Sequence, residues 1–279
     1  MNEISKQRIE LAKRNLDFFK NEHLIASMVS GSVAKGIADD YSDIDMMILY
    51  DKPVTQAEYE MIIDEAKSTG GDLYHGTAEE GFACYYFIDG IKCDFGIGLY
   101  TGYEMIISEM LEKPEIELTK HLMISGFIDG YALYGDKWIN IWKTKALEYP
   151  KELQVLMVKH FLKFHPEWVI EKMAVERDDT LFFYESLTEI TGNIIGILCG
   201  LNKMYHPGKL KGADWTIEQM NIKPENFIQR YKKVFETEKS VAITQLYILI
   251  REVLTLIESF LPEVSTERTR ELLEMKLRK

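Results

Sequence analysis

Hydrophobic residues recur at two different spacings along the chain, and the spacing changes near Thr101. Before that residue, apolar residues occur in short runs or at every second position, which is typical of strands. Strands are predicted at 24–29, 43–50, 72–75, 82–88 and 91–97. Apolar residues at helical spacing predict one helix at 3–22 and a second helix between Thr55 and Gly70.

Three local signals support these elements. Thr55 and Glu58 have the spacing of a capping box at the start of the second helix, and Gly70 is a favoured residue just past a helix end. The Asp89-Gly90 pair predicts a type I′ hairpin between the last two strands. Because a helix and a tight turn both connect strands, the segment predicts an α/β (α+β) domain with a mixed sheet.

After Thr101 the pattern is helical almost throughout. Helices are predicted at 102–112, 115–126, 137–147, 179–205, 224–236, 239–261 and 265–278, with two more next to Pro150 and Pro166. We therefore predict two domains, an α/β domain at 1–149 and an all-α helical bundle at 150–279.

Charge and composition narrow the possible functions. The chain has 33 Lys and Arg against 45 Asp and Glu, a net charge of −12, which disfavours a general nucleic-acid binder because such a protein needs a basic face. Cys84, Cys93 and Cys199 are too scattered for a disulfide framework or a zinc site, and we expect them to be buried. We find no signal peptide, and the apolar stretch 190–201 is too short to cross a bilayer. A cytoplasmic protein without membrane association is expected, and the sequence leaves its oligomeric state open.

One segment carries a pattern typical of phosphate and metal binding. The first strand leads into Gly31-Ser32, where glycine lets the backbone approach a ligand and serine supplies a hydroxyl donor. Asp43 and Asp45 follow at the start of the next strand. Side chains at positions i and i+2 of a strand face the same way, about 6–7 Å apart, so these two carboxylates can share divalent metal ions.

A third carboxylate comes from the strand at 91–97. Apolar residues alternate there, so Lys92, Asp94 and Gly96 share the other face. An aspartate in mid-strand beside two others needs a cation. Two Mg²⁺ ions held by three carboxylates are a recurring apparatus for in-line phosphoryl or nucleotidyl displacement.

The order Gly-Ser, spacer, Asp-x-Asp and later strand aspartate resembles the signature of nucleotidyltransferases of the DNA-polymerase-β-like superfamily. The run from Tyr41 to Met47 is similar to the antibiotic nucleotidyltransferases, including those that act on aminoglycosides and lincosamides. The resemblance implies that residues 1–149 form the catalytic domain. It also implies Mg²⁺, a nucleoside triphosphate, for which ATP is expected, and transfer of a nucleoside monophosphate to an acceptor hydroxyl.

The resemblance also implies roles for single residues. Gly31 and Ser32 would hold the β- and γ-phosphates, Asp43 and Asp45 would ligate metal, and Asp94 would ligate metal and act as the acceptor's base. Two further residues, Lys35 and Ser42, lie where phosphate contacts are expected.

The second half resembles the helical domains that follow this catalytic domain in the antibiotic-modifying branch. By that likeness Lys209 could lie over the triphosphate, although a solvated loop lysine explains the residue equally well. The expected acceptor is a small, cationic molecule of the aminoglycoside type. The acidic residues at 178, 185 and 189 fall near one face of a helix. That face could attract a cationic acceptor, or it could simply be exposed to solvent.

Three alternatives stay open. The acceptor could be a protein side chain or another metabolite, or the chain could be a nucleotide-binding regulator without catalysis. The base could also be Glu79 or Glu80, although an exposed acidic turn explains that pair better.

Overall fold

The computed structural model describes residues 1–275. The fold divides into two compact units, one formed by Met1–Lys113 with Met123–Glu148 and the other by Pro114–Leu122 with Tyr149–Lys279. The boundary expected at 149–150 assigns residues 114–122 to the first domain, whereas the structure groups them with the second unit. The reason is a long-range contact within that unit, since the backbone N–H of His206 donates to Nδ1 of His121.

The first unit contains a mixed sheet that has six strands within residues 1–275, in the order β3-β4-β5-β2-β1-β6. Its strands are β1 Leu24–Val29, β2 Ile44–Tyr50, β3 Asp72–Thr77, β4 Gly81–Ile88, β5 Ile91–Leu99 and β6 Tyr131–Tyr134. Strand β2 pairs parallel with β5 and antiparallel with β1. Five strands agree with the sequence prediction, and β6, which pairs with β1, was not predicted.

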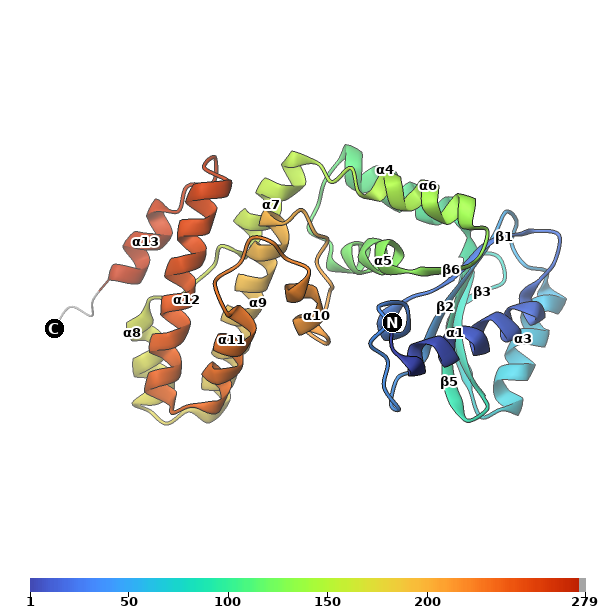
Figure 1. Ribbon diagram of the computed structural model, residues 1–279, viewed down its shortest axis with the longest axis horizontal. Coiled ribbons are helices and arrows are strands. Elements are labelled where there is room, and N and C mark those ends of the chain that lie inside the picture. Colours follow the sequence, from blue (N-terminus) through green and yellow to red (C-terminus); the bar gives the residue numbers. More distant parts are fainter. Residues whose placement is uncertain (276–279) are drawn as a thin grey trace. The chain divides into compact units, whose positions relative to one another are not determined.

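Helices cover both faces of the sheet (Figure 1). On one face, α1 (Glu3–Leu16) and α3 (Gln56–Ser68) bury their apolar residues against the sheet, in a core that includes Ile44, Met46 and Phe95. On the other face, α4 (Tyr100–Glu112) contacts β5 and α6 (Asp136–Ala146) contacts β1. The short α2 (Gly31–Ala34) follows β1, and α5 (Leu118–Asp129) precedes β6.

Local signals explain where several of these elements begin and end. The capping box of α3 is present, with Glu58 accepting from the backbone of Thr55. Both Asp89 and Gly90 have a positive φ, as a type I′ turn requires. The first helix ends at Leu16 rather than at residue 22, because the chain tightens into a 3₁₀ turn at Asp17–Phe19.

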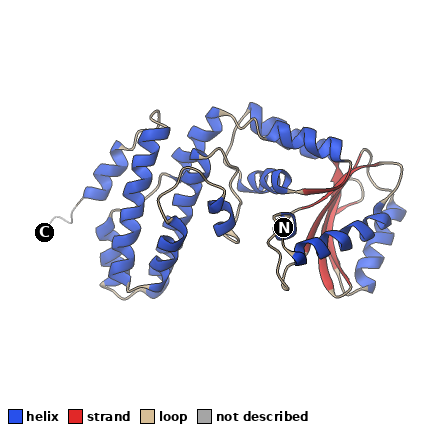
Figure 2. Ribbon diagram, in the orientation of Figure 1, coloured by secondary structure: helices blue, strands red, loops and turns tan. Residues whose placement is uncertain are grey.

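Within its described residues, the second unit contains helices and no strand. The strands drawn in Figure 2 belong to the first unit. Its helices are α7 Lys151–Phe161, α8 Glu167–Ile170, a π-helical turn Glu171–Val175, α9 Thr180–Leu201, α10 Ala213–Glu218, α11 Phe227–Glu236, α12 Lys239–Phe260 and α13 Glu267–Glu274. A mixed-sheet unit combined with a largely helical C-terminal region confirms the predicted fold class.

Three details of this unit differ from the expectation. The ninth helix, α9, ends at Leu201 rather than at 205, because the Asn202 side chain donates to Leu198 O and also accepts from the backbone N–H groups of Asn221 and Ile222. The short α10 was not predicted. The last helix begins after Thr266 instead of at Ser265, and residues 276–278 of the predicted helix lie outside the described residues.

The penultimate helix α12 is long and apolar enough to cross a membrane by length and composition alone. Half of its most apolar window is buried inside the protein, and the core helix of a soluble protein passes the same test. The sequence prediction of no membrane association was based on the stretch at 190–201 and did not consider this helix, and it stays a prediction.

Candidate functional site

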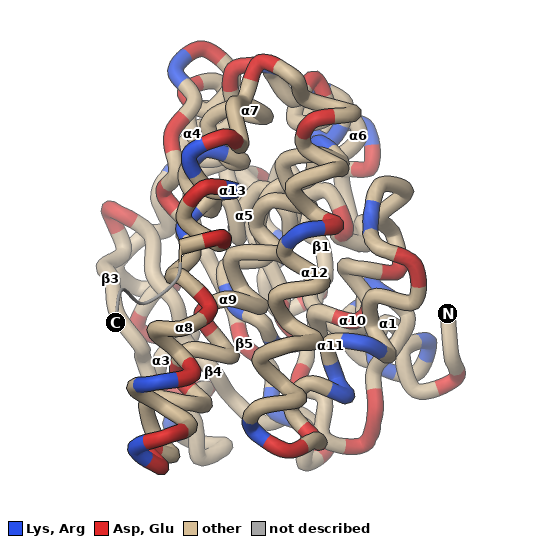
Figure 3. Tube along the Cα trace, turned by 90° about the vertical axis from the view of Figure 1, so that its left-hand side faces the viewer, with Lys and Arg blue, Asp and Glu red and all other residues tan. Residues whose placement is uncertain are grey.

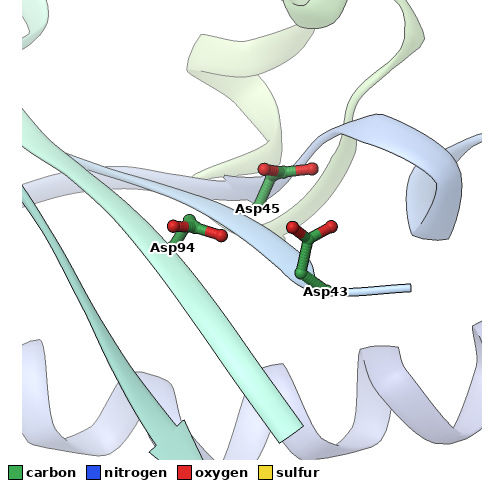
Figure 4. A group of neighbouring side chains, drawn as sticks. All are labelled: Asp43, Asp45 and Asp94. Atoms are coloured by element: carbon green, nitrogen blue, oxygen red, sulfur yellow. The ribbon is translucent and has the colours of Figure 1, made fainter. Parts of the chain in front are cut away.

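Two neighbouring strands bring the three predicted carboxylates together. Asp45 on β2 lies opposite Asp94 on β5 in the parallel register, and Asp43 precedes Asp45 by two residues. One oxygen atom from each of the three carboxylates lies within 4.8 Å of the other two, and all three residues are partly buried. Figure 4 shows the three side chains converging from the two strands.

The alternation of strand residues explains why these side chains share one face. Ile44, Met46 and Ile48 are buried in the core against α1 and α3, so Asp45 points to the opposite face of the sheet. Three carboxylates so close together repel one another unless a cation lies among them. An all-oxygen donor set suits a hard divalent ion such as Mg²⁺, so the residues fit the predicted metal site.

Gly31 lies directly against this cluster. A Cβ atom added at Gly31 would stand 2.2 Å from Oδ2 of Asp45, and the residue has a φ of +64°. The backbone N–H of Ser30 donates to the carbonyl oxygen of Asp45 over 2.8 Å. A side chain at position 31 would therefore displace the carboxylate, which explains the glycine without any reference to phosphate. The adjacent Ser32 hydroxyl has no hydrogen-bond partner among residues 1–275.

The loop between Ser32 and Asp43 is fastened to the start of the chain. The Asn2 side chain caps α1 by accepting from the backbone of Ser5, and its amide donates to Ala38 O over 2.8 Å. The Ser5 hydroxyl accepts from the backbone N–H of Ala38. The first helix thus holds the loop that leads into the carboxylates.

The structure adds two residues that sequence reasoning did not assign to the site. The Tyr74 hydroxyl donates to Oδ1 of Asp94 over 2.6 Å, and Lys92 Nζ donates to both carboxylate oxygens over 2.7 Å. Lys92 also lies 5.6 Å from the ring centre of Tyr74 and 5.2 Å from that of Tyr85, and the two rings stack. Only Lys92 had a sequence signal, because it shares a strand face with Asp94.

Electrostatics in this cluster reflect the charge on Asp94. Burial lowers the pKa of Lys92, but its hydrogen bonds to Asp94 and Tyr74 outweigh burial and raise the pKa well above the usual value. Burial raises the pKa of Tyr74, and its hydrogen bond to Asp94 raises it further. Lys92 is therefore a fixed positive charge, and Asp94 is held in position from two sides.

Three further residues, Lys35, Ser42 and Lys209, were predicted to contact phosphate, and the structure gives the first two other partners. Lys35 forms an ion pair with Asp129, with Nζ 3.4 Å from Oδ2 and both side chains largely buried. Burial raises the pKa of Asp129, and Lys35 opposes that rise. The Ser42 hydroxyl donates to Oδ1 of Asp39. Lys209 is exposed and belongs to the second unit. Their phosphate roles stay predictions.

The cysteines and the acidic turn at Glu79 and Glu80 lie as the sequence predicts. All three cysteines are buried, as expected, and burial together with the charge of Asp94 raises the pKa of Cys93 to about 12. Glu79 and Glu80 lie exposed in the turn between β3 and β4. Acidic and basic positions are interspersed along the described chain in Figure 3.

One comparison with known proteins concerns the N-terminal site. Residues 9–75 match the family described as "Nucleotidyltransferase domain". Among solved structures, the chain is similar to a nucleotidyltransferase-like protein from Exiguobacterium sibiricum 255-15, with 10% sequence identity, 96% of this chain and 84% of that chain covered, and a TM-score of 0.36. No curated protein matches the chain. The family match includes Gly31, Ser32, Asp43 and Asp45 and ends before Asp94. Residues 9–75 are therefore similar to a nucleotidyltransferase domain, and the third carboxylate lies outside the matched residues.

Proposed function

We propose that this protein transfers a nucleoside monophosphate, AMP from ATP, to a hydroxyl group of a small acceptor. The observation that carries the proposal is the convergence of Asp43, Asp45 and Asp94, since one carboxylate oxygen of each lies within 4.8 Å of the other two. The match of residues 9–75 to a nucleotidyltransferase domain supports the reaction class.

The three carboxylates, Ser32 and Tyr74 each have a chemical task in such a reaction. The acceptor oxygen forms a bond to the α-phosphorus while the bond from that phosphorus to the leaving pyrophosphate breaks, and Asp94 takes the proton of the hydroxyl group. Mg²⁺ held by Asp43, Asp45 and Asp94 would lower the pKa of that hydroxyl and offset the charge on pyrophosphate. The Ser32 hydroxyl group donates a hydrogen bond to the phosphates. Tyr74 hydrogen-bonds Asp94 on the side of Oδ1 and fixes its orientation.

The proposed acceptor class rests on the sequence resemblance and on the charges of α9. An aminoglycoside is the candidate that the sequence resemblance suggests, and Glu185 and Glu189 are exposed on α9, where they could attract a polycation. Asp178, the third acid of that face, is already paired with Lys239. A polycationic acceptor would therefore meet fewer free charges than the sequence indicates.

A pyrophosphate-release assay tests the proposed reaction. The four nucleoside triphosphates are each assayed with Mg²⁺ against aminoglycosides, lincosamides and neutral hydroxylated compounds, and ATP is expected to give the fastest release. Asp43→Asn should abolish release and keep the fold, because removing one negative charge relieves repulsion. Asp64→Asn is the matched control, since Asp64 is an exposed acid on α3. Near wild-type release by Asp43→Asn would contradict the metal assignment, and no release with any triphosphate would contradict the function.

A further inference from the structure

A cavity of about 670 Å³ opens on the face of the sheet that carries the carboxylates. It lies over β3, β4 and β5, and α4 forms one of its walls. Its volume is within the range of sites that bind small molecules. All of its lining residues belong to the first unit.

Two glycines on β5 form the floor of the cavity, and the backbone does not require glycine at either position. Gly96 and Gly98 line it, and a Cβ atom added to either residue would meet nothing within 4 Å. Neither is among the glycines with a positive φ in the described chain. Glycine in a strand interior weakens the strand and commonly marks a place where a ligand approaches the backbone closely.

A partly buried tyrosine lines the same cavity. Tyr103 on α4 packs against Phe127, and the surrounding atoms exclude enough water to raise the pKa of Tyr103 to about 12. Its hydroxyl is not among the buried polar atoms that lack a partner, so it is accessible from the cavity. A ligand that offers a hydrogen-bond acceptor could take the place of water at this hydroxyl.

The charge of the lining argues against a polycationic occupant. His75 and Glu80, both exposed, are its ionisable side chains apart from Tyr103. The wall is apolar, with Leu99, Met105 and Ile106. A ligand with several positive charges would find one carboxylate there, whereas an apolar ring would bury its surface on the glycine floor and this wall.

The position of the cavity relative to the carboxylates indicates which substrate it would take. Gly31 contacts Asp45 on the side of the carboxylate cluster that faces β1. The cavity lies on the other side of Asp94, because Gly96, which lines the cavity, follows Asp94 by about 7 Å along β5. In an in-line displacement, the attacking hydroxyl and the leaving pyrophosphate lie on opposite sides of the α-phosphorus. If pyrophosphate leaves toward Gly31, the acceptor approaches from the cavity.

We propose that this cavity binds the apolar ring of the acceptor, which is therefore a hydroxylated compound with an apolar ring rather than a polycationic amino sugar. This assignment rests on the proposed function. Tyr103 donates to a polar atom of the acceptor, and Gly96 and Gly98 make room for its flat face.

Binding of a matched pair of glucosides tests the proposal without turnover. Phenyl β-D-glucoside and methyl β-D-glucoside differ only in the ring, and ligand-observed NMR measures their affinities for the full chain. We expect the phenyl compound to bind more tightly, and Gly98→Val to weaken it by about tenfold or more. Thermal melting of Gly98→Val should be unchanged or higher, because valine is favoured in strands. Gly192→Ala on α9, where an added Cβ meets only ordinary contacts, is the matched control and should leave binding unchanged.

The outcomes separate the two proposals. Equal binding of the two glucosides, or a preference that survives Gly98→Val, overturns the cavity assignment. If Gly98→Val fails to fold, Tyr103→Phe replaces it, with about fivefold weaker phenyl glucoside binding expected for a lost hydrogen bond and unchanged binding overturning the assignment. Pyrophosphate release with an acceptor indifferent to Gly98→Val overturns the cavity assignment alone. Ring-dependent binding without release from any triphosphate overturns the proposed function, and the acceptor role with it.

Discussion

Replacing Gly31 with alanine tests whether the glycine exists to make room for a carboxylate. The new Cβ would stand 2.2 Å from Oδ2 of Asp45, whereas ordinary contacts begin at 3.4 Å. The carboxylate or the loop must therefore move by about 1 Å, a displacement that can lower an enzymatic rate about hundredfold. The positive φ of Gly31 adds backbone strain of roughly 1–2 kcal/mol for alanine.

Gly90→Ala separates the collision from the strain. Gly90 has a φ of +78°, similar to that of Gly31, but an added Cβ there would meet nothing within 4 Å. Both variants should therefore melt a few degrees below the wild type. Only Gly31→Ala should lose activity and need more Mg²⁺, because only there does the Cβ meet the carboxylate of Asp45.

Pyrophosphate release at increasing Mg²⁺ concentrations, with thermal melting of each variant, measures both effects. We expect kcat/KM of Gly31→Ala to fall about hundredfold below that of Gly90→Ala. If the two variants release pyrophosphate at rates within about threefold of each other, the loop accommodates the methyl group and the steric argument is refuted.

Three further predictions concern single side chains. Asp94→Asn should lower the single-turnover rate far more than nucleotide affinity, because Asp94 is used in the transition state. If the rate and the affinity, measured by nucleotide titration, fall equally, Asp94 is a metal ligand only. Tyr74→Phe should lower the rate about fivefold with unchanged nucleotide affinity, because Asp94 loses one hydrogen bond that fixes it, and an unchanged rate would show that Lys92 suffices. Glu58→Ala should destabilise the protein near neutral pH. The backbone of Thr55 lowers the pKa of Glu58, so its stabilisation is present above the unfolded-state pKa of about 4.3 and is lost as pH falls through the folded pKa. Melting temperatures of the variant and the wild type should therefore converge in acid, and a constant difference would contradict the assignment.

The carboxylate cluster could be predicted from the sequence because it depends on local rules. Side chains two residues apart on a strand share a face, which relates Asp43 to Asp45 and Lys92 to Asp94. Alternating apolar residues indicated which face each strand buries. The two pairs then needed only adjacent strands, and β2 and β5 are neighbours in the sheet.

Irregular strand pairing, contacts between residues far apart in the sequence and short strands could not be predicted from periodic patterns. Tyr74 reaches Asp94 from β3, where the register with β4 shifts between Leu73 and His75, and no periodic pattern indicates such an irregularity. Lys35 pairs with Asp129, a residue far along the chain at the end of α5. Strand β6, Tyr131–Tyr134, is short and partly exposed, so its residues lack the alternation that marks a half-buried strand.

Separate faces of β2 and β5 carry stability and function. Ile44, Met46 and Phe95 are almost fully buried against α1 and α3, so truncating them would create cavities and destabilise the unit by about 2–5 kcal/mol. Asp45 and Asp94 alternate with those residues and point to the opposite face, where they are only partly buried. The apolar face must therefore supply the free energy that holds three repelling carboxylates together. We therefore expect substitutions on the carboxylate face to change activity without unfolding the sheet, and substitutions on the apolar face to lower both stability and activity.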